Sequence, residues 1–248
     1  MLVTVEGIVI GKRTIGENNC FIDVLTDEYG VIEATAHGIK KLTSKNAGAC
    51  SLFSYSKFCF SKSGLKYTLN SAEPKVSFHR ISSDLEGLSL AAYFAEVVKF
   101  AVAEEQEAPG FLRFMAVTLY EIEKKRISFT QIKAVFELHI SAMLGFSPDL
   151  TVCRNCMCYE HEQMFFDPEE SCIYCGDCVP EEKGGLVPLS PDLLYAMRFI
   201  LYSDTDRIYR FTLTEAPLAG LSRICEDYLL RQLDRSFKSL DYYNSIKL

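Results

Sequence analysis

The sequence predicts a multidomain α+β protein, in which an N-terminal β-barrel precedes an α-helical domain that carries a cysteine-rich insertion. Three observations predict this plan. Segments with the two-residue period of β-strands fill the first third of the chain, and the period of three to four residues typical of helices follows. Six of the ten cysteines then lie between Cys153 and Cys178. At 248 residues, the chain is long enough for two or three small domains.

Five strands are expected in the first domain, at residues 2–10, 20–26, 31–36, 51–60 and 65–70. Each is rich in β-branched or aromatic residues, and glycine, asparagine or aspartate marks the turns between them. The apolar positions change phase at Gly7, which predicts a β-bulge there. Five short strands in so few residues are typical of an OB-fold barrel, and a small SH3-like barrel fits the strand count nearly as well.

Apolar residues then recur at helical spacing, which predicts three helices around residues 90–101, 112–122 and 132–143. Ser190 followed by Pro191 predicts the N-cap and first residue of a fourth helix, and a last helix is expected after Pro217. We therefore divide the chain into an OB-fold domain at 1–80, two parts of a helical domain at 81–150 and 186–248, and the insertion at 151–185.

The cellular compartment is predicted from what the sequence lacks. Its apolar runs are far shorter than the ~20 residues that cross a bilayer, and the N-terminus has no basic region before its apolar stretch, so it is not a signal peptide. A reducing cytoplasm is expected, where clustered cysteines favour metal binding over disulfides. Four cysteines outside the cluster are expected to be small buried hydrophobic residues: Cys20, Cys50, Cys59 and Cys225.

Two C-x-x-C pairs separated by about 15–20 residues form a zinc-site signature. Cys153 and Cys156 are the first pair in either solution. The second pair is Cys172/Cys175, after a spacer of 15 residues, or Cys175/Cys178, after a spacer of 18. Four cysteines make a closed structural site, whereas catalytic zinc keeps an open position and uses histidine or carboxylate ligands.

Charge is divided unevenly along the chain. Residues 1–80 carry a net charge of +3 and the remainder −10. The insertion, with eight acidic and two basic residues, would repel phosphate, so structural support or contact with a partner protein is its expected role. The basic residues of the barrel are candidates for tracking a nucleic-acid backbone: Lys12, Arg13, Lys40, Lys41 and Lys45. Tyr55, Phe58 and Tyr67 are candidates for base stacking or for the core.

No P-loop, dinucleotide fingerprint or nucleophile elbow occurs in the sequence, so no catalytic residue is assigned and the protein is not expected to be an enzyme. His161 lacks the second histidine of an H-E-x-x-H zinc site and is expected in an exposed loop. The main alternative to a DNA-binding function is a zinc-ribbon protein–protein adaptor whose barrel binds a peptide.

The chain resembles the bacterial RecO family of recombination mediators over nearly all of its length. The matching stretches include E-G-I-V-I and G-E-N-N near the start, followed by D-E-Y-G-V-I-E-A-T-A-H-G-I-K-K. Later ones are S-x-x-D-L-E-G-L-S-L-A-A-Y-F-A-E, M-L-G-F-S-P-D-L-T-V-C-R-N-C and R-S-F-K-S-L. Their order and spacing together are specific, although no single one is decisive.

The resemblance implies an OB-fold domain, a helical domain and a zinc-binding insertion in a protein of DNA damage repair and DNA recombination. It implies binding of single- and double-stranded DNA and annealing of complementary strands coated by single-stranded DNA-binding protein. The implied partners are RecR, the C-terminal tail of the coating protein and, indirectly, RecA. The implied location is the cytoplasm, in association with the nucleoid and without membrane contact.

The resemblance also implies which cysteines hold a structural Zn²⁺. Family members typically run through Gly-Gly and two apolar residues into the second C-x-x-C pair, so Cys172 falls where the family has glycine. The implied ligands are Cys153, Cys156, Cys175 and Cys178, with Cys158 and Cys172 as additional cysteines. The sequence departs from the family at Met157, because a glycine usually follows the first pair.

Overall fold

The computed structural model describes residues 1–41, 43–180 and 183–247. They form two compact units, one made of Met1–Arg126 and Phe237–Leu248, the other of Ile127–Ser236. The four segments expected from the sequence follow a finer division, and their boundaries stay a prediction. No helix within the described ranges combines the length and the apolarity that a membrane span requires.

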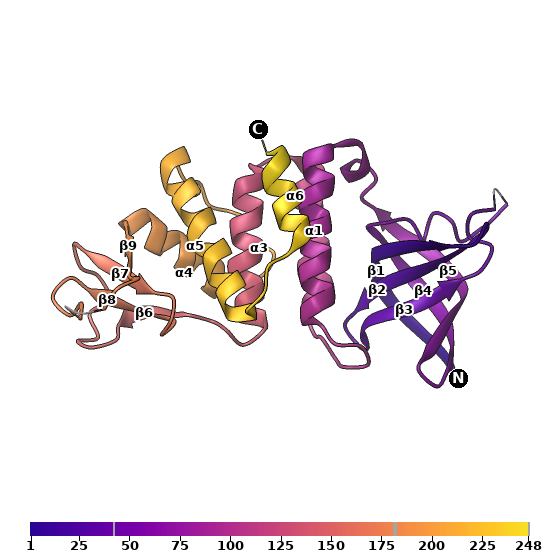
Figure 1. The fold of residues 1–248 in the computed structure, drawn as a ribbon, viewed down its shortest axis with the longest axis horizontal. Coiled ribbons are helices and arrows are strands. Elements are labelled where there is room, and N and C mark those ends of the chain that lie inside the picture. Colours follow the sequence, from indigo (N-terminus) through magenta and orange to yellow (C-terminus); the bar gives the residue numbers. More distant parts are fainter. Residues whose placement is uncertain (42, 181–182, 248) are drawn as a thin grey trace. The chain divides into compact units, whose positions relative to one another are not determined.

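The first unit contains a closed five-stranded barrel, drawn in indigo to purple in Figure 1. Its strands are β1 (Leu2–Ile15), β2 (Asn19–Thr26), β3 (Gly30–Ala36), β4 (Ser54–Ser63) and β5 (Lys66–Ser77). Neighbouring strands follow the order β1-β2-β3-β5-β4, and only β3 and β5 pair in parallel. Pairing of β1 with β4 completes the ring. The structure confirms the OB-like barrel that the sequence predicts.

The barrel closes around alternate apolar residues of all five strands. Phe58 and Tyr67, two candidates for base stacking, belong to this core, because they are only 0% and 2% exposed. The bulge predicted at Gly7 lies instead between Val9 and Gly11, where the pairing of β1 with β2 changes register. Gly7 serves close packing, since a Cβ there would lie 2.5 Å from Cγ1 of Val24.

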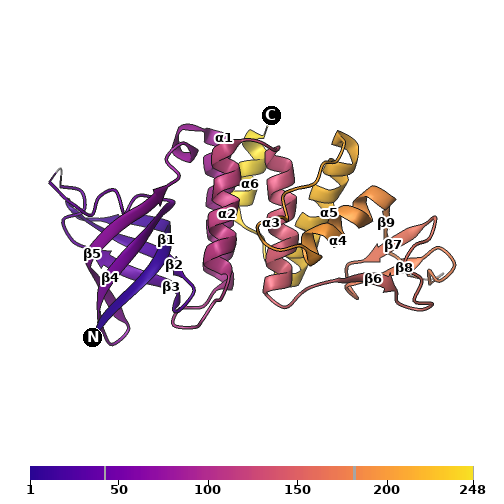
Figure 2. The same cartoon turned by 180° about the vertical axis from the view of Figure 1, so that it is seen from behind.

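Three helices complete the first unit: α1 (Leu85–Ala101), α2 (Phe111–Lys124) and α6 (Lys238–Ile246). Asp84 caps α1 by accepting a hydrogen bond from the backbone N–H of Gly87. Helices α1 and α6 lie side by side (Figures 1 and 2). The sequence did not predict α6, because this nine-residue helix has only two buried residues and so lacks a clear apolar stripe.

The loop between α1 and α2 attaches the helices to the barrel. The backbone N–H of Glu105 donates to the carbonyl of Tyr29 over 3.0 Å, and that of Ala108 donates to the carbonyl of Asp27 over 2.8 Å. Gly30 permits this approach, since it has φ of +61° and a Cβ there would lie 2.0 Å from the carbonyl oxygen of Ala103. The turn between β2 and β3 therefore packs against the loop between α1 and α2.

The second unit combines three helices with a small sheet. The helices are α3 (Phe129–Met143), α4 (Pro191–Tyr202) and α5 (Glu215–Leu233). The strands are β6 (Asp149–Cys153), β7 (Met164–Asp167), β8 (Cys172–Cys175) and β9 (Val187–Leu189), in the order β6-β8-β7-β9. Ser190 accepts a hydrogen bond from the N–H of Leu193 and Pro191 begins α4, which confirms the predicted start of this helix.

Candidate metal centre and basic rim

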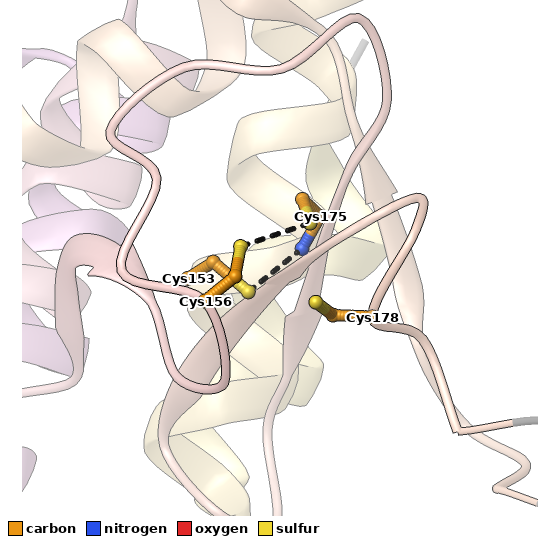
Figure 3. Close-up of side chains that lie close together, drawn as sticks. All are labelled: Cys153, Cys156, Cys175 and Cys178. Carbon is orange, nitrogen blue, oxygen red and sulfur yellow. Dashed lines mark hydrogen bonds between the residues drawn. The ribbon is translucent and has the colours of Figure 1, made fainter.

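The sheet of the second unit brings two pairs of cysteines together. Cys153 ends β6 and Cys175 ends β8, and these two strands are parallel neighbours. Each C-x-x-C segment turns directly after its strand, so Cys156 and Cys178 return toward the same point (Figure 3). The four Sγ atoms all lie within 4.8 Å of one another. We refer to Cys153, Cys156, Cys175 and Cys178 as the four-cysteine cluster.

Backbone hydrogen bonds shape the first turn of the cluster. The N–H of Met157 donates to the carbonyl of Cys153 over 2.9 Å, and the N–H of Cys153 donates to the carbonyl of Cys158 over 2.8 Å. Met157 has φ of +63°, the left-handed conformation that glycine adopts without strain. The turn therefore forms without the glycine that the family usually has, and the side chain of Met157 is 66% exposed.

The thiols of the cluster differ in acidity. Burial alone would raise the pKa of Cys153, but hydrogen bonds from the backbone N–H groups of Cys156, Cys175 and Asn155 outweigh burial and lower this pKa to about 6. One of these bonds joins the N–H of Cys175 to Sγ of Cys153 over 3.3 Å (Figure 3). Side-chain hydrogen bonds to Cys175 and Cys156 raise the pKa of Cys178 to about 12. The first turn thus favours thiolate at Cys153 and also lowers the pKa of Cys156, through a backbone hydrogen bond from Cys158, and a bound cation would favour thiolate at all four sulfurs.

The donor set fits a four-thiolate metal site. Tetrahedral zinc with Zn–S bonds of about 2.3 Å holds its sulfurs about 3.8 Å apart, and Sγ of Cys156 lies 3.6 Å from Sγ of Cys175. The cluster could therefore bind zinc, with no position left for a substrate. Among the described residues, the group of four includes neither Cys158 nor Cys172. The guanidinium of Arg154 lies 3.6 Å from Sγ of Cys172.

The five basic candidates of the barrel are all exposed. Lys12 and Arg13 lie near the end of β1, and Lys40, Lys41 and Lys45 lie in the loop after β3. Two hydrogen bonds join this loop to the turn between β1 and β2: Lys40 N–H to the carbonyl of Asn18, 3.2 Å, and Gly38 N–H to Oδ1 of Asn19, 2.8 Å. Residues far apart in the sequence thus share one part of the barrel, which we name the basic rim.

Four of the five rim cations have no acidic partner among the described residues: Lys12, Lys40, Lys41 and Lys45. Arg13 is paired with Glu33 and lies over the ring of Phe21, 5.5 Å from its centroid. Two other barrel lysines are neutralised, in the pairs Lys75–Glu6 and Lys62–Glu105, whereas Lys57 and Lys66 have no acidic partner among the described residues. The rim therefore gathers four unpaired cations in one part of the barrel.

Phe21 is an aromatic residue of the rim that the sequence analysis did not select. It is partly exposed on β2, between the buried residues Cys20 and Ile22. The alternation of β2 contained this signal, because an aromatic residue at the outward phase of a strand has no place in the core. Tyr55, the remaining stacking candidate, donates its hydroxyl hydrogen bond to Glu6.

Comparison with known proteins finds matches to both the barrel and the part of the chain that contains the four-cysteine cluster. The family model described as Recombination protein O N terminal matches residues 1–78, and the one described as Recombination protein O C terminal matches residues 82–241. A DNA repair protein RecO from Acetivibrio thermocellus is 28% identical, over 97% of this chain and 96% of its own length. One from Symbiobacterium thermophilum is 30% identical, over 99% of this chain and 98% of its own length.

Proposed function

The chain belongs to the RecO family of DNA repair proteins, and on this premise we propose that it is a recombination mediator that binds single- and double-stranded DNA and anneals complementary strands. In this proposal it acts with RecR to load RecA, in the cytoplasm at the nucleoid. It also contacts the C-terminal tail of the single-stranded DNA-binding protein. Annealing needs only a surface that keeps two strands close and lets bases pair. In this proposal the protein is therefore not an enzyme.

The basic rim is the observation that carries the proposal. Its unpaired lysines lie on exposed loops and strand ends of an OB-like barrel, a fold that commonly tracks the backbone of single strands. Lysine at the rim would contact phosphates without reading sequence. Phe21, beside Arg13, offers a partly exposed ring on which a base could stack.

The four-cysteine cluster has a structural role in this proposal. Cys153, Cys156, Cys175 and Cys178 would hold Zn²⁺, which supplies no chemistry beyond joining β6 to β8. Both cations of this region are already paired, Arg154 with Glu170 and Lys183 with Asp167. The region around the cluster therefore remains acidic and is not the proposed DNA-binding surface.

A gel-shift and annealing assay tests the proposal. The variant Lys40→Glu/Lys41→Glu should bind a labelled oligo-dT at least about tenfold more weakly than the unmodified chain, and its annealing rate should fall in parallel. The matched control is Lys124→Glu/Arg126→Glu, which makes the same change in charge at exposed positions at the end of α2. Equal losses in both variants would contradict a specific role for the rim. Absence of DNA binding by the unmodified chain would favour the zinc-ribbon adaptor instead.

A further inference from the structure

A pocket of about 660 Å³ lies in the second unit, beside the four-cysteine cluster. The segment between the two cysteine pairs forms one wall with Tyr159, Glu160 and Glu162, and helix α4 forms another with Tyr195 and Tyr202. Its volume is within the range of about 300–1,000 Å³ found for ligand pockets. Neither the proposed DNA-binding rim nor the proposed metal ligands use these residues.

Exposed aromatic rings gather at this pocket. Tyr159, Tyr195 and Tyr202 are 55%, 62% and 58% exposed, although much of a tyrosine ring is normally buried. Neighbours nevertheless hold these rings in place. Tyr195 leans on Phe199 with ring centroids 6.1 Å apart, and the hydroxyl of Tyr202 lies 3.2 Å from Oγ1 of Thr151. A group of positioned, exposed rings is typical of a binding surface.

Arg198, the one lysine or arginine among the described residues that line the pocket, is already engaged. Its Nε donates to the carbonyl of Leu150 over 2.7 Å, and its Nη2 donates to the carbonyls of Thr151 and Tyr159 over 3.0 and 2.9 Å. Its guanidinium also lies 4.0 Å from the ring centroid of Tyr159. Arg198 therefore joins the loop wall to α4, with most of its donors unavailable to an anionic ligand.

The remaining charge at the pocket is negative. Glu160 and Glu162 are exposed, and neither has a cationic partner among the described residues. The N–H of Gly176 donates to Nδ1 of His161 over 3.4 Å. This hydrogen bond joins the loop to the second cysteine turn. Two carboxylates thus lie at the edge of a tyrosine-lined pocket whose wall depends on the fold of the four-cysteine cluster.

We propose that this pocket binds a basic segment of a partner protein and takes an arginine or lysine side chain between its tyrosine rings. The ring faces attract the cation, the apolar floor that includes Leu194 packs against its aliphatic stem, and Glu160 and Glu162 compensate its charge. The stacking of Arg198 on Tyr159 is an example of the same contact within the protein. The site goes beyond the proposed DNA function, because phosphate or an acidic peptide would meet two carboxylates.

Fluorescence anisotropy with three probes tests the proposal on the full chain. The probes are labelled Gly-Arg-Leu-Lys-Leu-Arg-Gly, the same peptide with glutamate at each basic position, and labelled oligo-dT. The basic peptide should bind and the acidic one should not. Tyr195→Leu, which keeps an apolar side chain but removes the ring, should weaken the basic peptide about three- to fivefold, and Tyr195→Phe should retain its affinity. The double variant Glu160→Gln/Glu162→Gln should also weaken binding of the basic peptide, and this effect is expected at low salt.

Two controls separate the pocket from general attraction to an acidic protein. Tyr242→Leu removes a tyrosine that is 52% exposed on α6, and Glu104→Gln/Glu107→Gln removes two exposed carboxylates from the first unit. Both should leave peptide affinity unchanged. Equal losses in these controls, or tighter binding of the acidic peptide, would overturn the proposal. A loss of oligo-dT affinity in Tyr195→Leu would also overturn it and would assign the pocket to nucleic acid, whereas failure of the DNA function alone would leave it intact.

Discussion

The barrel and the four-cysteine cluster both contain buried cysteines, but the pKa values of Cys50 in the barrel and Cys153 in the cluster shift in opposite directions. Cys50 of the barrel is fully buried, and burial raises its pKa to about 12. Cys153 of the cluster is also fully buried, yet its pKa falls to about 6 because backbone N–H groups of the cysteine turns surround it. Burial alone therefore does not decide the pKa of a thiol. At Cys153 the hydrogen bonds of the backbone turn outweigh burial.

The two regions also differ in what stabilises them. The barrel encloses a core that includes apolar residues from each of its five strands. The sheet beside the cluster has strands of only three to five residues, so it contains far fewer cross-strand pairs than the barrel. We expect the barrel to depend on apolar packing and the small sheet to depend on metal. The four predictions below test this difference, in order of decreasing effect.

The largest effect is expected from removing a metal ligand. Cys175→Ser should lose stoichiometric zinc and unfold the sheet β6–β9, because a structural zinc site contributes on the order of 10–16 kcal/mol at neutral pH. Cys172→Ser, three residues before the second pair but outside the four-cysteine cluster, is the matched control and should retain zinc. Elemental analysis measures the metal, and hydrogen exchange locates the unfolding.

The barrel should be unaffected by this change. Amide protection in strands β1–β5 of Cys175→Ser should equal that of the unmodified chain, since none of the four ligands belongs to the barrel. Loss of zinc in Cys172→Ser with retention in Cys175→Ser would contradict the ligand assignment. Loss of protection throughout the chain would contradict the independence of the two regions.

A core truncation in the barrel is the reverse experiment. Phe58→Ala removes a ring that is 0% exposed and stacks on Phe60 with centroids 5.5 Å apart. It should destabilise the barrel by about 3–5 kcal/mol and leave the zinc content unchanged. Leu65→Ala, at a position 75% exposed, should cost less than about 0.5 kcal/mol. Urea denaturation followed by hydrogen exchange measures both, and zinc release by Phe58→Ala would show that the regions are coupled.

The sequence predicted the parts whose signals are local. β-Branched and aromatic residues between turn signals placed β2 and β3 at 20–26 and 31–36, and the pair Ser190-Pro191 placed the start of α4. The ends of β1 and β5 were underestimated. Lys12 and Arg13 carry no apolar alternation, and they belong to β1 because Ile22 and Phe21 of β2 pair with them. Strand length here is decided by the partner strand and not by the segment itself.

Contacts between distant segments could not be predicted. The basic rim exists because the loop after β3 bonds to Asn18 and Asn19, and no spacing in the sequence indicates that contact. The tyrosine pocket similarly needs Arg198 to bind carbonyls of β6 and of the segment after Cys158. The C-x-x-C spacing was informative because the ligand geometry of zinc limits which spacings can close. A pocket has no comparable constraint.

Salt dependence measures how many rim cations act together. If five cations release counterions from single-stranded DNA, log Kobs should fall with log salt with a slope of about −3.5. Lys40→Gln/Lys41→Gln should reduce the slope to about −2.1 and weaken binding about tenfold. Arg154→Gln/Lys183→Gln, which neutralises two cations already paired with acids beside the cluster, should leave the slope unchanged. Equal slopes for both double variants would remove the distinction between the rim and the acidic region.

The smallest effect is expected where the backbone is left-handed. The turn between β4 and β5 uses glycine, Gly64 at φ of +59°, whereas the first cysteine turn uses Met157 at φ of +63°. A residue with a Cβ costs about 1–2 kcal/mol in this conformation. Glycine avoids this cost, but its larger conformational entropy in the unfolded chain offsets part of the benefit. Met157→Gly should therefore stabilise the small sheet by roughly 0.5 kcal/mol, and Gly64→Ala should destabilise the barrel by about 1 kcal/mol.

Chelator competition should show about twofold tighter zinc binding in Met157→Gly. Urea denaturation measures the loss of stability in Gly64→Ala. Met157→Leu is the control for the first, because it keeps a Cβ at the same φ and should leave zinc affinity unchanged. Because the side chain of Met157 is exposed, its replacement by glycine removes little buried surface. Weaker zinc binding in Met157→Gly would therefore mean that the methionine side chain itself supports the turn, so that the cluster, like the barrel, would rest on apolar contact as well as on metal.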